Sequence, residues 1–312
     1  MHFWILVKRS LQFYARSHIG TIAGAIVASA VLVGALAVGD SVRGSLRQMA
    51  LSRLGSVEFA LVANDRIFRS SLSENLQGSV EREVAAAMVV LGTASSDGGA
   101  ARANRVNVLG VEDDFWSWAL QPEAIGAIES GQVVLNEPLA SQLGVAIGDS
   151  VLFRVPKPSN LSRDAPLSPE EDTSVAMRLT VQRIISDVAF GRFSLHASQV
   201  PPFNAFVGRS YLQGRIEQED GANLLLVGPG DEAIDSESLM TSLRQHWTLP
   251  DAQLELRELS NGSDLELRSS RVFLDEVIVN SVNSVEPEAM GVMTYFVNSL
   301  EVGDRLNPYS MV

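Results

Sequence analysis

The sequence predicts an α+β extracytoplasmic domain of two lobes, anchored by one N-terminal transmembrane helix. Three observations lead to this class. An uncharged apolar segment lies near the start of the chain. After it, segments with alternating apolar residues, typical of strands, are mixed with short helix signals. A proline-rich segment then interrupts these elements midway along the chain.

Composition and charge narrow the possible functions. The chain has 312 residues, of which 46% are hydrophobic and 20% charged, a balance typical of a globular protein with buried cores. It contains no cysteine, which excludes a disulfide scaffold, a zinc-thiolate site and a cysteine nucleophile. With 24 basic and 37 acidic side chains, the net charge is −13. Because a chain with this net negative charge repels phosphate backbones, nucleic acid is not an expected partner.

Residues 1–18 are predicted to form an amphipathic segment on the cytoplasmic side of a membrane. As a helix, this segment places apolar side chains on one face and polar ones largely on the other: Phe3, Val7, Leu11 and Tyr14 against Lys8, Arg9, Gln12 and Arg16. Ile5 and Leu6 blur the apolar stripe. The pattern is typical of a helix that lies in the lipid headgroup region, so membrane lipid is an expected partner.

Residues 19–39 are predicted to cross the membrane. The stretch from Ile19 to Val38 is uncharged, and as a helix it would rise roughly 30 Å, the thickness of the hydrocarbon core of a bilayer. Small residues along it would allow another transmembrane helix to approach closely; we predict helix packing at Gly20, Gly24, Ala28 and Gly34.

Two alternatives to a retained span stay open at this point. One is a buried helix of a soluble protein, although such helices seldom run for 20 residues without a polar face. The segment also resembles a secretory signal peptide, because basic residues precede it and Ala35, Leu36 and Ala37 fit the small-x-small pattern before a cleavage site.

The charges that flank the span predict its orientation. Lys8, Arg9 and Arg16 precede it, and no acidic residue occurs before Asp40. Positive residues favour the cytoplasmic side, so we expect the N-terminus in the cytoplasm and the bulk of the chain outside a bacterial inner membrane. The arginines that follow the span favour the opposite orientation.

The rest of the chain divides into four predicted parts. Residues 40–56 continue the spanning helix as a stalk, with Gly44 and Gly55 as its weak points. Residues 57–155 form a first lobe and residues 174–312 a second one. Between them, residues 156–173 form a proline-rich linker or loop with no apolar periodicity.

Apolar alternation and capping signals place the elements of the body. Strands are predicted at Val57–Leu61, Val84–Leu91, Arg105–Val111, Gln132–Leu135, Ser150–Val155, Met177–Ile185, Ala205–Val207, Asn223–Val227, Gln253–Arg257, Leu265–Arg268 and Val272–Val279. One helix is predicted after Asn136 as its N-cap, from Glu137 to Leu143, with Gly144 ending it. A second is predicted from Ser236 to about His246.

The sequence offers no set of residues for catalysis, a cofactor or a metal. Its only lysines, Lys8 and Lys157, do not follow a glycine-rich phosphate loop, so the chain is not expected to hydrolyse ATP. No Gly-x-Ser-x-Gly nucleophile elbow occurs. The four histidines lack the spacing of metal ligands, and the acidic runs do not follow a calcium-loop pattern. We therefore expect a protein that is not an enzyme.

Several segments resemble one known family. They are the basic segment LVKRSLQFYARSHIG, the span itself, GDSVRGSLRQMALSRLGSVEFAL after it, VNVLGVEDDFW at 106–116, and SGQVVLNEPLASQLGVAIGDSVLF at 130–153. Together with the order of the elements, these segments are similar to the MacB and FtsX-like permeases of ABC transporters. The similarity covers the N-terminal spanning helix and the periplasmic core domain, and each segment is a packing pattern and not a chemical signature.

The resemblance implies a function by mechanical coupling. Members of the family have three further spans after the extracytoplasmic domain, so this chain resembles the N-terminal part of a longer permease. The implied partners are a separate cytoplasmic ABC ATPase subunit, a second permease in a homo- or heterodimer, and a periplasmic or outer-membrane protein.

Two other functions share the predicted features. One is a membrane-anchored extracytoplasmic sensor or adhesion domain, which would have the same topology. The other is a secreted protein whose signal peptide has been cleaved.

Overall fold

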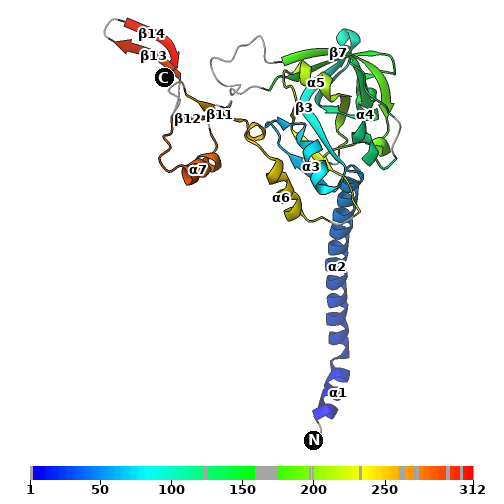
Figure 1. Cartoon of the computed structure of the whole chain (residues 1–312). Coiled ribbons are helices and arrows are strands. Elements are labelled where there is room, and N and C mark those ends of the chain that lie inside the picture. Colours follow the sequence, from blue (N-terminus) through cyan, green and yellow to red (C-terminus); the bar gives the residue numbers. More distant parts are fainter. Residues whose placement is uncertain are drawn as a thin grey trace. The chain divides into compact units, whose positions relative to one another are not determined.

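The computed structural model describes residues 3–121, 125–158, 174–196, 198, 200–231, 234–259, 264–269, 271, 274–292, 296–302 and 305–311. The chain forms two compact units (Figure 1). One holds the described residues up to Ala252, and the other holds those from Gln253 on.

Two helices begin the first unit. α1 (Phe3–Phe13) is followed by Tyr14, whose backbone is not helical, and then by α2 (Ala15–Ser52). The 38 residues of α2 correspond to a length of about 57 Å. No residue of either helix is buried. In Figure 1, α1 and α2 extend away from the sheet of this unit. The break at Tyr14 lies four residues before the expected boundary at 18.

The body of the first unit is built on one mixed sheet of eight strands. Their order in the sheet is β1-β10-β3-β4-β8-β5-β7-β6, and β6 also pairs with β3. The bounds are β1 (Phe59–Val62), β3 (Val84–Ser96), β4 (Arg102–Val111), β5 (Gln132–Asn136), β6 (Ser150–Pro156), β7 (Ser174–Ile185), β8 (Phe203–Gly208) and β10 (Leu224–Val227). The additional β3–β6 pairing closes six of the strands into a barrel, and β10 and β1 extend the sheet beyond it.

The long strand β3 joins the barrel to this extension. Its first residues, Val84 to Ala87, pair with β10, and its last residues, Thr93 to Ser96, pair with β6. The register to β4 shifts between Gly92 and Thr93. A Cβ atom at Gly92 would lie 2.5 Å from the carbonyl oxygen of Arg154, so only glycine allows β6 to approach at this point.

Short elements connect the strands of the first unit. They are β2 (Phe68–Arg69), α3 (Leu72–Val80), 3-10 turns at Asp97–Gly99, Asp113–Trp118, Asp187–Ala189 and Leu249–Ala252, α4 (Glu137–Leu143), α5 (Arg209–Arg215), β9 (Gly221–Ala222) and α6 (Ser236–His246). α4 forms as predicted: the Asn136 side chain accepts a hydrogen bond from the Leu139 amide, and Gly144 ends the helix in the left-handed region with φ 63°.

Alternating residues of the strands divide between separate cores. Val133 and Leu135 lie in the cluster that also contains Val106, Val108 and side chains of α4 and α5. Their neighbour Val134 belongs to a second, aromatic cluster. A third cluster lies around Leu72 and Leu76 of α3 and the strands β1 and β10. Burial on both faces explains why these strands contain long apolar runs.

The second unit consists of two hairpins and one helix. Its elements are β11 (Leu254–Glu258) paired with β12 (Leu265–Ser269), α7 (Glu276–Val285), and β13 (Phe296–Val302) paired with β14 (Arg305–Met311). Arg257–Glu266 and Arg268–Glu255 form ion pairs across the first hairpin. Cross-strand pairs of opposite charge of this kind support the register of a two-stranded sheet.

The structure confirms the α+β class, and two further differences from the prediction concern the second half of the chain and the expected linker. The strand expected at Val272–Val279 is wrong, because residues from Glu276 form α7. Ile278 and Val282, four residues apart, are its half-buried side chains, which is a helical period and not a strand period. Most of the expected linker at 156–173 lies outside the described residues. Since β6 and β7 on either side of it pair in one sheet, the chain divides at Ala252 and not there.

Candidate functional site

The expected span lies within α2. Among the described residues, this is the one helix that is long and apolar enough to cross a membrane. None of its apolar window is buried within the chain, so it is not the core helix of a soluble body. The helix continues without interruption through Gly44 and ends at Ser52, about 21 Å beyond Val38. Length and composition alone do not separate a retained span from a signal sequence.

The predicted packing residues of the span contact nothing else in this chain. Gly20, Gly24, Ala28 and Gly34 are all exposed along α2. A Cβ atom at any of the three glycines would meet no atom within 4 Å. Helix packing at these four residues therefore stays a prediction about a partner outside this chain.

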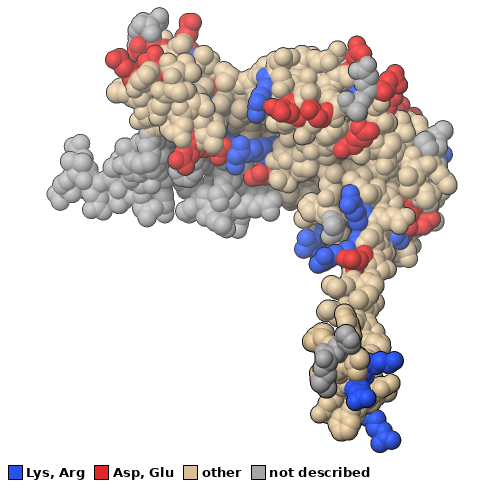
Figure 2. Space-filling view, turned by 90° about the horizontal axis from the view of Figure 1, so that it is seen from below, with Lys and Arg blue, Asp and Glu red and all other residues tan. Residues whose placement is uncertain are grey.

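The basic residues expected to set the orientation lie before and at the start of α2. Lys8 and Arg9 lie on α1, and Arg16 follows the first residue of α2. All three are exposed. In Figure 2, blue side chains are visible at the free end of the stem that α1 and α2 form, and the tan stretch next to them is apolar or uncharged.

A short joint fastens the end of α2 to the body. The backbone amide of Ser56 donates a hydrogen bond to the carbonyl oxygen of Trp118 at 2.9 Å, and the Ser56 hydroxyl donates to the same oxygen at 3.3 Å. On either side of these bonds, Leu54 and Val57 pack against the aromatic core cluster. β1, the edge strand of the sheet, begins only two residues after Val57, so the chain passes from α2 into the sheet without a long linker.

Gly55 makes this joint sterically demanding. Its φ of 56° lies in the left-handed region, which residues with a Cβ rarely adopt. A Cβ atom at this position would overlap the carbonyl oxygen of Trp118 and lie 2.5 Å from Cε2 of Phe190. In the expected stalk helix over residues 40–56, Gly55 is a weak point. In the structure the helix ends three residues earlier, and Gly55 permits the close contact with the body.

The body side of the joint is an aromatic cluster. Phe115, Trp116 and Trp118 lie in the 3-10 turn Asp113–Trp118, and all three are buried. Phe115 makes edge-to-face contacts with Phe190 at 5.1 Å and Phe193 at 5.2 Å between ring centroids. Interlocked rings of this kind deform little. Ser56 and its neighbours therefore contact a tightly packed part of the body.

Arg53 places an unpartnered charge at the same joint. The residue is 4% exposed, and its three guanidinium nitrogens are buried with no hydrogen-bond partner among the residues that the structure describes. It caps the C-terminal end of α2, where a positive charge interacts favourably with the helix dipole. That interaction is small compared with the several kcal/mol that burial of an unpaired ion costs. The docked joint is therefore held under an electrostatic penalty.

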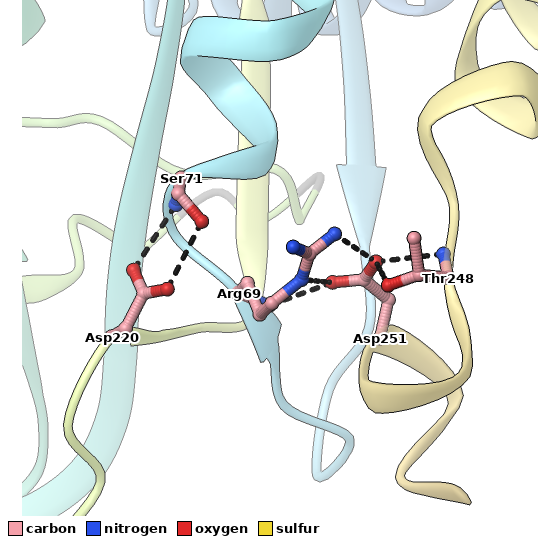
Figure 3. Close-up of polar contacts among 5 residues, drawn as sticks. All are labelled: Arg69, Ser71, Asp220, Thr248 and Asp251. Atoms are coloured by element: carbon pink, nitrogen blue, oxygen red, sulfur yellow. Dashed lines mark hydrogen bonds and ion pairs between the residues drawn. The ribbon is translucent and has the colours of Figure 1, made fainter.

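A network of hydrogen bonds holds the end of the first unit (Figure 3). We call it the clasp, and it consists of Arg69, Ser71, Asp220, Thr248 and Asp251. Arg69 donates to Asp251 through its backbone amide and through Nε and Nη2, at 3.0, 2.9 and 2.8 Å. Thr248 adds bonds from its amide and its hydroxyl to the same carboxylate, both at 2.9 Å. Beside it, Asp220 accepts bonds from Ser71 through its amide at 3.1 Å and its hydroxyl at 3.0 Å.

These hydrogen bonds control the ionisation of the two carboxylates. Burial of Asp251 opposes its ionisation, but the bonds from Arg69 and Thr248 outweigh it, so its pKa is lowered. Burial of Asp220 is likewise outweighed by bonds from Ser70 and Ser71, and its pKa is also lowered. The clasp therefore fixes β2 to the last turn before the second unit begins.

Sequence reasoning missed most of this arrangement. The clasp joins residues 182 positions apart, and the joint contacts a residue 62 positions away. No local pattern reports such pairings. A local signal that could have pointed to the joint is Arg53, which directly follows a long helix and precedes Gly55 by two residues. Among the described residues there is no group of three or more metal-ligating side chains.

Comparisons with known proteins give two structural similarities. No family model matches the sequence, and no curated relative matches it. The periplasmic region of MacB from Actinobacillus actinomycetemcomitans is 12% identical, with a TM-score of 0.37, over 74% of this chain and 92% of that chain. The extracellular domain of the noncanonic ABC-type transporter YknZ from Gram-positive bacteria is 10% identical, with a TM-score of 0.35, over 59% and 88%. At such low identities and TM-scores, neither match establishes the family or the function of this chain.

Proposed function

We propose that the chain is a non-catalytic permease subunit of an ABC transporter, or the N-terminal part of one. In this proposal a separate cytoplasmic ATPase drives the permease, and the extracytoplasmic body acts on substrate or partner proteins. The observation that carries it is the unbroken helix from the expected span to the joint at Arg53–Val57. The resemblance of the sequence to MacB and FtsX-like permeases supports the same assignment.

The physical argument is that of a lever. A continuous helix transmits a displacement or rotation along its axis without losing it in a flexible linker. The contact of Ser56 with Trp118 and the packing of Leu54 and Val57 pass that movement to β1 and the aromatic cluster. A tether that only anchors a domain does not need so close a connection, and a flexible segment would serve it equally well.

The proposal includes the expected placement and partners. The N-terminus lies in the cytoplasm and the body outside a bacterial inner membrane. A second permease packs against the face of Gly20, Gly24, Ala28 and Gly34, and a periplasmic or outer-membrane protein contacts the body.

Isolation of the full chain from its native membrane tests the proposal. We expect an ABC ATPase to co-purify and the complex to hydrolyse ATP. A flexible Gly-Gly-Ser insertion after Ser52 should leave the complex assembled but remove any effect of ligands of the body on ATP hydrolysis. The same insertion after Gly98, in an exposed turn between β3 and β4, is the matched control and should retain that effect.

Two results would contradict the proposal. A preparation that stays free of any ATPase at every stage would favour a membrane-anchored sensor or adhesion domain. Equal behaviour of the insertions after Ser52 and after Gly98 would show that the joint transmits nothing.

A further inference from the structure

The joint between α2 and the body is held by few contacts. Both hydrogen bonds of Ser56 end on a single acceptor, the carbonyl oxygen of Trp118. The apolar contacts on either side come from Leu54 and Val57, which are only half-buried. Regions of a domain with few buried contacts open locally, at a lower free energy than the unfolding of the whole domain. The joint is therefore a part of the fold that can open separately from the sheet.

Burial of Arg53 opposes docking of the joint. All three of its guanidinium nitrogens are closed off from solvent, and Arg53 is the only arginine in the described part of the chain for which this holds without a hydrogen-bond partner. Neither water nor an anion can reach these nitrogens while the joint is docked. A guanidinium does not lose its proton in proteins, so Arg53 cannot avoid the cost of burial by becoming neutral. Hydration of this charge therefore requires the joint to open.

A second buried arginine of the same unit shows how this fold satisfies such a charge. Arg82 is 6% exposed, close to the 4% of Arg53. One of its guanidinium nitrogens, Nη1, donates to the carboxylate of Glu58 at 2.7 Å and to the carbonyl oxygen of Gly228 at 3.1 Å. Glu58 follows the joint closely in the sequence and yet pairs with Arg82. The uncompensated burial is thus particular to the arginine at the joint.

The body side of the joint is strained at Phe190. Its φ of 68° lies in the left-handed region, which is unusual for a residue with a bulky side chain. The ring of Phe190 lies directly against Gly55, where no Cβ atom fits. Strained residues of this kind persist only where the surrounding contacts impose them, and they concentrate at sites that change conformation. Both sides of the joint thus carry an unfavourable feature in the docked state.

We propose that the joint has two states, the docked state of this structure and an open state in which Ser56 leaves Trp118 and the guanidinium of Arg53 reaches water. The buried charge keeps the two states close in free energy, so a movement of α2 opens the joint and a reverse movement closes it. The body follows α2 in the docked state and is released from it in the open state. The inference rests on the proposed function for the source of that movement, whereas the two states themselves need no ATPase.

Amide hydrogen exchange of the full chain in detergent micelles tests this proposal. Mass spectrometry follows the amide of Ser56 and, as a reference, the amide of Val108, a buried residue of β4 in the middle of the sheet. After correction for intrinsic exchange rates, Ser56 should exchange at least roughly a hundredfold faster than Val108, because its exchange needs only a local opening. This measurement uses the natural chain and does not depend on any variant.

Two matched variants test the role of the charge. Arg53→Met should slow the exchange of Ser56 at least roughly tenfold, because an apolar side chain in place of an unpaired buried charge favours the docked state. Arg47→Met makes the same substitution at an exposed arginine of α2 and should leave the rate unchanged. The exchange of Val108 shows for each variant that the sheet is folded.

Four results would overturn the proposal. Exchange of Ser56 as slow as that of Val108 in the natural chain would mean that the joint opens only when the whole unit unfolds. An unchanged or faster rate in Arg53→Met, or loss of protection at Val108 in that variant, would mean that Arg53 does not oppose docking. Equal slowing in Arg47→Met would mean that position 53 has no special role. None of these rates depends on co-purification of an ATPase, so the proposed function stands or fails separately.

Discussion

Replacement of Gly55 by alanine tests whether the joint is a close-fitted contact. Three effects of the new Cβ add together. The left-handed backbone costs about 1–2 kcal/mol for a residue with a Cβ. Loss of the hydrogen bond from the Ser56 amide to Trp118 costs about 1 kcal/mol. The Cβ also overlaps backbone, the Trp118 carbonyl, which cannot turn aside as a flexible side chain could.

Together these effects predict that Gly55→Ala lowers the free energy of unfolding of the first unit by about 3 kcal/mol. The assay is urea unfolding of the full chain in detergent, followed by tryptophan fluorescence, because Trp116 and Trp118 lie in the cluster at the joint. Limited proteolysis after Ser52 should also accelerate, because the joint no longer stays docked.

The matched control is Gly44→Ala. Gly44 lies inside α2, and a Cβ atom there meets nothing within 4 Å. Alanine should stabilise the helix by up to about 1 kcal/mol without affecting the body. If Gly55→Ala unfolds at the same urea concentration as the natural chain and resists proteolysis equally well, the close fit at the joint is refuted.

Three further changes address the span, the clasp and the buried charge. Leu32→Arg places a charge near the middle of the span at a cost of roughly 3 kcal/mol, so the protein should become extractable from membranes by alkaline carbonate; full retention would show that the span is misplaced. Asp251→Asn should lower the free energy of unfolding by about 2–3 kcal/mol, because the bonds from Arg69 lose their charge assistance, whereas the exposed control Glu219→Gln should have no effect in the same urea assay. The pKa of Asp251 is lowered in the folded state, so its contribution to stability is present above its unfolded pKa of about 3.9 and is lost as the pH falls through its folded pKa. In an acid titration the natural chain should therefore lose more stability than Asp251→Asn, which keeps the contribution of Asp220. Arg53→Met removes the unpartnered charge and should raise the unfolding free energy by about 1–4 kcal/mol, and a destabilised variant would mean that Arg53 has a favourable partner.

Local signals predicted the parts of this fold that depend on neighbours in sequence. The helix after Asn136 follows from its cap and from Gly144, and the spanning helix from an uncharged run of sufficient length. α7 was misread because Val277, Ile278 and Val279 are consecutive β-branched residues, which favour a strand. In the structure the half-buried positions Ile278 and Val282 follow the period of a helix instead.

The arrangement of the strands and the candidate site depend on contacts that no local pattern contains. The barrel closes through the pairing of β3 with β6. The need for glycine at position 92 follows from the close approach of the Arg154 backbone, which lies far away in the sequence. Similarly, nothing around Asp251 in the sequence indicates Arg69 as its partner. Gly55 and Arg53 could be noticed as unusual residues after an apolar helix, but their roles depend on Trp118 and on burial.

Cysteine labelling in whole cells tests the central claim, that a retained span holds the body outside the membrane. Because the natural chain has no cysteine, single substitutions at exposed positions report unambiguously. A membrane-impermeant maleimide should label Gln245→Cys on α6 in intact spheroplasts. It should label Gln12→Cys on α1 only after the membrane is permeabilised. Labelling of Gln12→Cys in intact spheroplasts, or a mature protein that has lost residue 12, would contradict the account.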